Sequence, residues 1–333
     1  MFLDNLFGSK RPNMRLEAKQ PTSIALGVFS LSLITAIVQI ICVPIIQLLA
    51  PDLLNEAWFN LVFSSGTMYL VAFPLSLLFF GIGTANPPKK KDLPLSAWFG
   101  ILAISFTLMI VGNYIGGIVN SIIEGFVGKP QTNAVSDMIA DIPTWVIFIV
   151  VAVAAPIVEE IVYRKLVIDR LRRYGDLTAI VVSGILFGLI HGNFSQFFYA
   201  TLLGVVFGIV YVQTGKLRYT IALHMAVNFM GSVYSSEMLR RLETLDLENT
   251  SAALTSQETV GMLMLIGYYL FIFVCFIAAP AAFSRLIHHI RLQKPSVKLT
   301  ALQTIRIWLL NPAVWLLLIM ILLSFWSSIA VPV

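Results

Sequence analysis

Cysteine is nearly absent from this chain: Cys42 and Cys275 are the only two in 333 residues, and both lie in apolar stretches. They provide neither a disulfide framework nor a cysteine-rich metal cluster. Charged residues are also scarce at 12%, whereas 58% of residues are hydrophobic and the mean hydropathy is +0.87. This composition excludes an ordinary soluble globular protein and indicates a polytopic protein embedded in a lipid bilayer.

A cleavable signal peptide is not expected, because residues 1–22 are polar and basic before the first long apolar run. Crossing the hydrocarbon layer of about 30 Å takes about 20 apolar residues in a helix. We therefore expect an all-α polytopic transmembrane bundle of about eight or nine spans. The runs that meet this length most closely are 23–50, 58–83, 94–123, 143–164, 176–194, 196–213, 219–236, 259–284 and 305–330.

Basic residues predict the orientation of these spans, since they favour the cytoplasmic side. Lys89–Lys91 follow the second span and Arg170–Arg173 follow the fourth, whereas the connection 237–258 is rich in acidic residues. We expect a multi-pass protein of a bacterial plasma membrane with a cytoplasmic N-terminus. The net charge of +5 is then a signature of the inner face and gives no indication of nucleic-acid binding.

The expected organisation has three parts. An N-terminal tail with three flanking spans covers 1–142, a core of four spans covers 143–236, and an outer loop with two C-terminal spans covers 237–333. The core contains the polar side chains whose burial in a membrane costs free energy. We expect it to enclose an intramembrane catalytic cavity.

Two adjacent glutamates, Glu159 and Glu160, lie in the fourth apolar span. A carboxylate in hydrocarbon costs several kcal/mol unless it faces a partner or a water-filled cavity, so this pair indicates a functional site. Glu160 and Arg164 are four residues apart on one helix face, and Glu159 points about 100° away. This spacing predicts that Arg164 neutralises Glu160 while Glu159 faces a cavity. Alternatively, both glutamates extend to the cytoplasmic interface beside the arginine cluster.

Three further polar residues lie in separate apolar segments of the core. They are His191, His224 and Asn228, and the last two share one helix face at a spacing of four. Each could have a structural role as a satisfied histidine or as an interhelical hydrogen bond. Together with a glutamate, they can supply a general base, an orienting group and donors for an oxyanion.

Three motifs in this region resemble those of a known family. Glu159-Glu160-x-x-x-Arg164, Phe187-x-x-x-His191 and His224-x-x-x-Asn228 are similar to the signatures of the CAAX protease and bacteriocin-processing (CPBP) intramembrane endopeptidases, which include the type II CAAX prenyl endopeptidase. The resemblance covers about 150–235. It implies that Glu159 activates the hydrolytic water, His191 assists, His224 and Asn228 hold the oxyanion, and Glu160 and Arg164 organise the site.

Two alternatives to metal-free proteolysis remain open. Glu159, His191 and His224 could ligate a catalytic zinc ion with one open position, although the sequence has no His-Glu-x-x-His motif. A non-catalytic immunity or sensor protein could also use the same scaffold for binding. We favour glutamate-activated water without a cofactor, acting on a peptide or protein substrate at the membrane.

The alternation of basic and acidic connections predicts the topology directly. A reporter fused after Lys91 or Arg173 should register the cytoplasm, and one fused near Glu248 should register the outside. Paired phosphatase and fluorescent-protein fusions measure both sides. The reverse pattern at all three positions would overturn the orientation.

Overall fold

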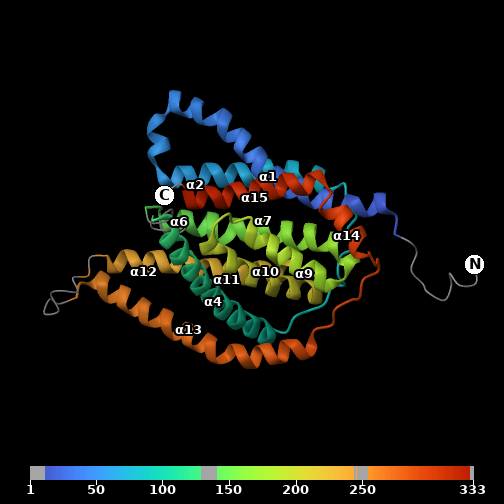
Figure 1. Ribbon diagram of the computed structural model, residues 1–333. Helices are drawn as coiled ribbons and strands as arrows, with labels where there is room; N and C mark the ends of the chain where they lie inside the picture. The colour runs from blue at the N-terminus through green and yellow to red at the C-terminus, as the bar shows by residue number, and fades with distance from the viewer. Residues whose placement is uncertain (1–11, 129–140, 244, 246–253, 331–333) are drawn as a thin grey trace, which may run out of the picture.

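The computed structural model describes residues 12–128, 141–243, 245 and 254–330, and every regular element within them is helical (Figure 1). The all-α bundle expected from the composition is confirmed. Short 3₁₀ and π-helical segments, labelled η, interrupt several helices. The elements are α1 (Met14–Leu49), η1 (Pro51–Asn55), α2 (Ala57–Gly66), η2 (Thr67–Ala72), α3 (Phe73–Phe80), α4 (Leu95–Val127), α6 (Thr144–Ile147), η3 (Phe148–Ala154), α7 (Ala155–Glu160), η4 (Ile161–Ile168), α8 (Asp169–Leu171), η5 (Arg172–Tyr174), α9 (Asp176–Leu189), α10 (Phe194–Thr214), α11 (Leu217–Asn228), η6 (Phe229–Tyr234), α12 (Ser235–Leu242), α13 (Ser256–His289), α14 (Ala301–Trp308) and α15 (Pro312–Ala330).

Seven helices in the described ranges are long and apolar enough to cross a membrane. The expected span at 176–194 is shorter, because α9 ends at Leu189. The expected span at 219–236 falls within the continuous helical run from α11 to α12, which is not one of the seven. The chain is thus a multi-pass bundle in which α9 is a short apolar helix packed against longer ones.

The prediction of one span at 305–330 is wrong, because the helix is interrupted between α14, which ends at Trp308, and α15, which begins at Pro312. Pro312 has no N–H group and is suited to the first position of a helix. Asn311 precedes it, and its side-chain oxygen accepts a hydrogen bond from the Ala313 N–H at 3.0 Å. A new helix therefore starts at Pro312.

The fourth helix is longer than the predicted span 143–164 and runs from Thr144 to Tyr174. Its last turns are buried in protein because the arginines there have internal partners. Arg170 donates to the backbone oxygen of Phe80, and the Arg172 Nε donates to the Asp176 carboxylate at 2.8 Å. The sequence predicts a cytoplasmic connection at this position, and that sidedness stays a prediction. The guanidinium groups close hydrogen bonds inside the bundle.

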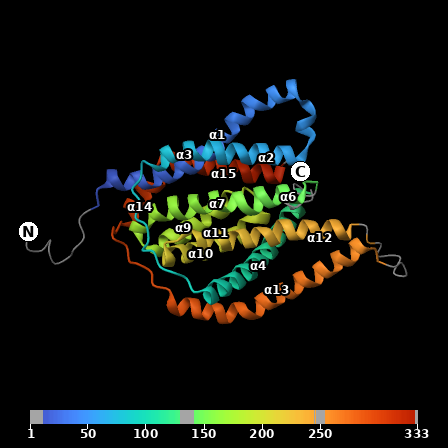
Figure 2. The same ribbon diagram turned by 180° about the vertical axis from the view of Figure 1, so that it is seen from behind.

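Polar contacts hold together the end of the bundle where α1 begins and η5 ends (Figure 2). Arg173 contacts the Glu17 carboxylate at 2.7 Å, which ties the fourth helix to α1. The Asn86 N–H donates to the Asp169 backbone oxygen, and the Val297 N–H donates to the Arg173 backbone oxygen. Segments distant in the sequence thus fix the C-terminal turns of the fourth helix.

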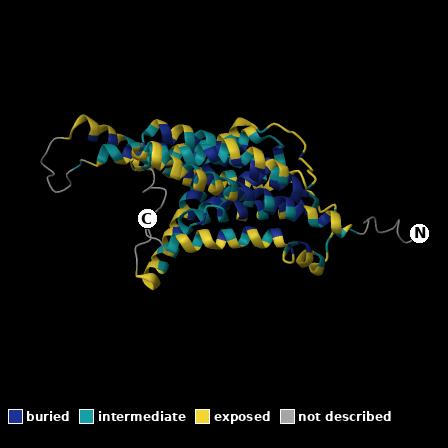
Figure 3. Cartoon of the chain, turned by 90° about the horizontal axis from the view of Figure 1, so that it is seen from above, coloured by how far each residue is buried: buried dark blue, intermediate teal, exposed yellow. Residues whose placement is uncertain are grey.

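Burial is concentrated on the inner helices (Figure 3). In α10, 56% of an apolar stretch of 18 residues is buried. In α13 only 11% of such a stretch is buried, as expected for an outer helix facing lipid. The inner helices α9 and α10 cross closely at two glycines. A Cβ atom on Gly204 would lie 2.8 Å from the Gly184 Cα, so both positions require a residue without a side chain. α9 also packs against the fourth helix, because Ser183 donates to the Tyr163 backbone oxygen.

Candidate active site

Glu160 and Arg164 form a fully buried ion pair at the centre of the bundle. The Arg164 Nε donates to Glu160 Oε2 at 2.9 Å and Nη2 donates to Oε1 at 3.2 Å, and both side chains are 0% exposed. The bidentate geometry is the strongest form of this interaction. Neither residue of this pair extends to the membrane interface. The alternative in which both glutamates extend to the cytoplasmic interface therefore does not hold for Glu160.

Glu159 lies on the adjoining helix face, and its side chain is 26% exposed. Its Oε2 lies 3.7 Å from the Nε2 of His224. The opposite ring nitrogen of His224, Nδ1, donates to Glu160 Oε1 at 3.2 Å. The His224 ring therefore lies between two carboxylates, one buried and held by arginine and one partly open.

His191 joins the same centre through the ring of Phe187. The Phe187 ring packs edge-on against His191 and His224, with centroid distances of 5.1 Å and 5.6 Å. The His191 Nδ1 donates to the Phe187 backbone oxygen at 2.7 Å, which assigns the proton to Nδ1 and leaves Nε2 free. The Arg164 guanidinium lies 5.2 Å from the centroid of Phe187. Phe187 thus contacts both histidines.

Asn228 lies one turn beyond His224 on the same face. Its Nδ2 donates to the backbone oxygen of Val151 at 2.9 Å, and Val151 lies in the π-helical segment η3. An asparagine amide has two N–H groups. One of them anchors α11 to the fourth helix, and the other remains for a further acceptor.

Direct contacts link four of the six residues expected from the sequence, namely Glu159, Glu160, Arg164 and His224. His191 is connected to them through the Phe187 ring, and Asn228 lies one turn beyond His224. A serine nucleophile is not supported, since Ser183 is buried, donates to the Tyr163 backbone oxygen and accepts from Arg164. The sequence reasoning missed Phe207, whose ring lies 5.6 Å from that of His224. Nothing in its local sequence distinguishes this phenylalanine from others in apolar helices.

The zinc alternative needs three ligands around one point. Among the described residues, no group of three or more His, Cys, Asp or Glu side chains is arranged to hold a metal ion. Within the expected set, the Glu159 carboxylate lies 3.7 Å from the His224 Nε2. The zinc ligand set of Glu159, His191 and His224 stays a prediction.

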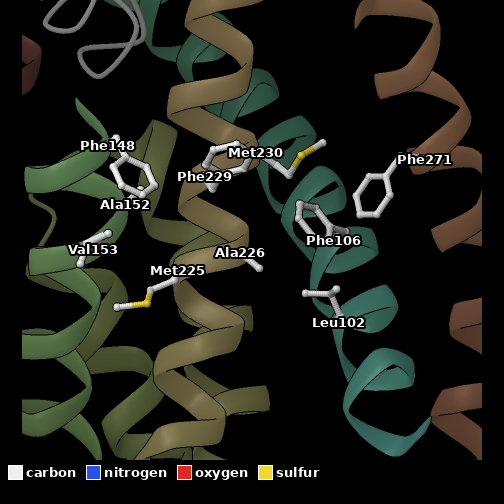
Figure 4. Close-up of a pocket in the computed structure, with 10 residues that line it drawn as sticks. All are labelled: Leu102, Phe106, Phe148, Ala152, Val153, Met225, Ala226, Phe229, Met230 and Phe271. Atoms are coloured by element: carbon white, nitrogen blue, oxygen red, sulfur yellow. The ribbon is translucent and has the colours of Figure 1, made fainter. Parts of the chain in front are cut away.

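The structure also contains an apolar cleft of about 420 Å³ (Figure 4). It lies between the fourth helix, α11 with η6, α4 and α13. Met225 and Phe229 follow His224 and Asn228 directly in the sequence, so one helix serves both the polar centre and the cleft. Aromatic and methionine side chains dominate its wall, namely Phe106, Phe148, Met225, Phe229, Met230 and Phe271.

Comparisons with known proteins match the same region. The family model described as type II CAAX prenyl endopeptidase Rce1-like matches residues 141–230, which include all three motifs. The resemblance to CAAX endopeptidases is confirmed. YdiL of Bacillus subtilis, named as a candidate membrane peptidase, is 24% identical over 191 residues, which cover 54% of this chain and 76% of YdiL.

A second relative is the membrane-embedded CAAX protease MroQ of Staphylococcus aureus. It is 29% identical over 149 residues, which cover 42% of this chain and 57% of MroQ. No solved structure matches the chain. The family model thus matches the core that carries the three motifs.

The buried ion pair generates a stability prediction. Arg164→Leu leaves the Glu160 carboxylate uncompensated in the core, and removing one partner of such a pair typically costs about 3–5 kcal/mol. We expect a lower melting temperature and less folded protein in detergent. Arg218→Leu is the matched control, since the Arg218–Asp92 pair is exposed, and it should change the melting temperature little. Equal melting temperatures for the two variants would contradict the role of the pair.

Proposed function

We propose that this protein is an intramembrane endopeptidase in which Glu159 activates the attacking water. The observation that supports this most directly is the convergence of Glu159, His191, His224 and Asn228 beside a buried Glu160–Arg164 pair. Similarity to CAAX-type membrane proteases supports the reaction class. Glu159 is the acid of the pair with room for water, because its side chain is partly exposed.

The proposed reaction starts with water held by Glu159 and the free Nε2 of His191. Glu159 takes one proton as the water oxygen attacks the peptide carbonyl, and it later gives that proton to the leaving amine. His224 and Asn228 donate to the oxyanion that forms in between. A donor at His224 Nε2 requires the doubly protonated ring, in which Nδ1–H bonds Glu160. The products are a carboxylic acid and an amine, so one water is consumed.

We further propose that the substrate is a membrane-associated peptide or peptide precursor with an apolar segment. The cleft of about 420 Å³ has an entirely apolar lining and adjoins the helix that carries His224 and Asn228. It would bind the apolar segment while the scissile bond lies at Glu159. The names of the family and of MroQ refer to CAAX substrates. A prenylated peptide is therefore one member of the proposed substrate class.

The substrate can be identified before the mechanism is tested. Membrane fractions of cells that make the wild-type protein are compared with fractions of cells that make Glu159→Gln, and peptides unique to the wild type report cleavage. A synthetic peptide spanning the cleaved bond then serves with purified protein. Equal peptide sets in both strains would favour the alternative of a non-catalytic immunity or sensor protein.

Substitutions in the centre should separate the roles of its members. Glu159→Gln and His191→Ala should lower turnover about 10²–10⁴-fold, because each removes a group that handles the water. His224→Ala and Asn228→Ala should lower turnover about 10²–10³-fold with less effect on binding, because an oxyanion donor acts on the transition state. Turnover and KM are measured with the synthetic peptide on variants of normal melting temperature.

The matched controls are Glu124→Gln and His289→Ala, which change exposed residues outside the site. Both should retain wild-type turnover. Cleavage by Glu159→Gln at the wild-type rate would rule out Glu159 as the base. Unchanged turnover in His224→Ala and Asn228→Ala would remove these residues from the oxyanion site.

Metal dependence is tested on the same purified protein. If Glu159 activates water directly, a sample without stoichiometric zinc should cleave the peptide, and chelation should leave turnover unchanged. If three side chains held zinc, removing the ion would abolish activity and zinc would restore it. Elemental analysis alongside the activity assay decides between them. One zinc per chain, with activity lost and regained on its removal and return, would contradict the metal-free mechanism and leave the protease assignment intact.

A further inference from the structure

His191 lies in a tight turn between two helices, and its position depends on how that turn is held. The turn consists of the four residues 190–193 between α9 and α10. Gly192 has a φ of +67°, and a Cβ there would lie 2.7 Å from the Ser324 Cβ of α15. The turn is therefore pressed against α15 and needs glycine at this position.

The side chain of Asn193 bonds on both sides of this turn. Its Oδ1 accepts from the Gln196 N–H at 2.9 Å and so caps α10. Its Nδ2 donates to the His191 backbone oxygen at 2.8 Å and to Gln196 Oε1 at 2.8 Å. The orientation of the amide follows from chemistry, because a backbone N–H only donates and a backbone carbonyl only accepts. Asn193 thus links His191 to the first turn of α10.

The first turn of α10 is itself fixed by α4. The Asn120 Nδ2 donates to Ser195 Oγ at 2.7 Å. A Cβ on Gly116 would lie 2.8 Å from the Phe194 backbone oxygen, so the two helices touch through their backbones. Asn193 therefore connects His191 to a rigid contact between two long helices.

Besides its N–H bond to the Gly188 backbone oxygen at 3.3 Å, His191 is held at two further points. Its ring donates through Nδ1 to the Phe187 oxygen, and its backbone oxygen accepts from Asn193. The first contact sets the direction of the ring and the second sets the backbone from which the ring projects. Loss of the second would let the turn shift while leaving the ring contact in place.

We infer that Asn193 is a positioning residue for His191, which places the free Nε2 of His191 toward the water at Glu159. This inference rests on the proposed function for its effect on hydrolysis. Functional groups must be held within about 0.5 Å of the productive geometry. A misplacement of about 1 Å can lower the rate by about 10²-fold. Asn193 acts through His191 and takes no part in the chemistry itself.

The test variant is Asn193→Ser. A serine hydroxyl can still cap α10, but it cannot supply the two amide N–H donors. The matched control is Asn60→Ser, which makes the same substitution at an exposed asparagine whose Nδ2 also donates to a backbone oxygen, that of Leu54. We expect Asn193→Ser to lower turnover about ten- to a hundredfold with KM within about twofold. Asn60→Ser should leave both unchanged.

A second measurement follows His191 itself, independently of activity. The chain has only four histidines, His191, His224, His288 and His289, so ¹⁵N-histidine labelling gives few signals, and His191→Ala assigns those of His191. In Asn193→Ser, the signals of His191 should shift while those of His288 and His289 stay in place. A purely structural loss would lower the melting temperature without selecting His191.

The inference is supported if turnover falls and the His191 signals shift in Asn193→Ser only. It is overturned if turnover stays within twofold of the wild type, or if turnover falls while the His191 signals remain unchanged. Should the wild-type protein cleave no peptide, the proposed function fails, and the His191 signals alone decide whether Asn193 positions the ring.

Discussion

The site depends on the cost of a charged carboxylate inside a membrane helix. Glu160 is stable there because Arg164 binds both of its oxygens. Arg164 also donates to Ser183 of α9 and stacks on Phe187, while Glu160 accepts from His224 of α11. One buried ion pair therefore joins three helices and fixes where His224 lies. A buried pair adds little net stability but removing one partner is costly, so its main effect is to specify this arrangement.

Polar and apolar parts of the site share the same helices. The run from α11 into η6 carries both His224 and Asn228 of the polar centre and Met225 and Phe229 of the apolar cleft. The π-helical segment η3 supplies the Val151 oxygen that anchors Asn228. π-helical segments occur frequently at functional sites.

Local spacing predicted the contacts made within one helix, and contacts between distant segments were beyond it. The spacing of four residues placed Glu160 on Arg164 correctly. The burial of Arg170 could not be predicted, because its partner is the backbone oxygen of Phe80, 90 residues away. The capping of α10 by Asn193, in contrast, has a local sequence signal. An asparagine directly after His191-Gly192 is suited to cap the next helix. Phe207 left no such signal.

Helix geometry gives the two adjacent glutamates different surroundings, although their side chains are identical. Glu160 accepts hydrogen bonds from two arginine nitrogens and one histidine nitrogen, so its lone pairs are occupied. Glu159 makes no hydrogen bond within the described part of the chain, and its side chain is 26% exposed. A rotation of about 100° between neighbouring residues produces this difference. Glu160 therefore holds the site together, whereas Glu159 is the carboxylate that would take a proton from water in the proposed reaction.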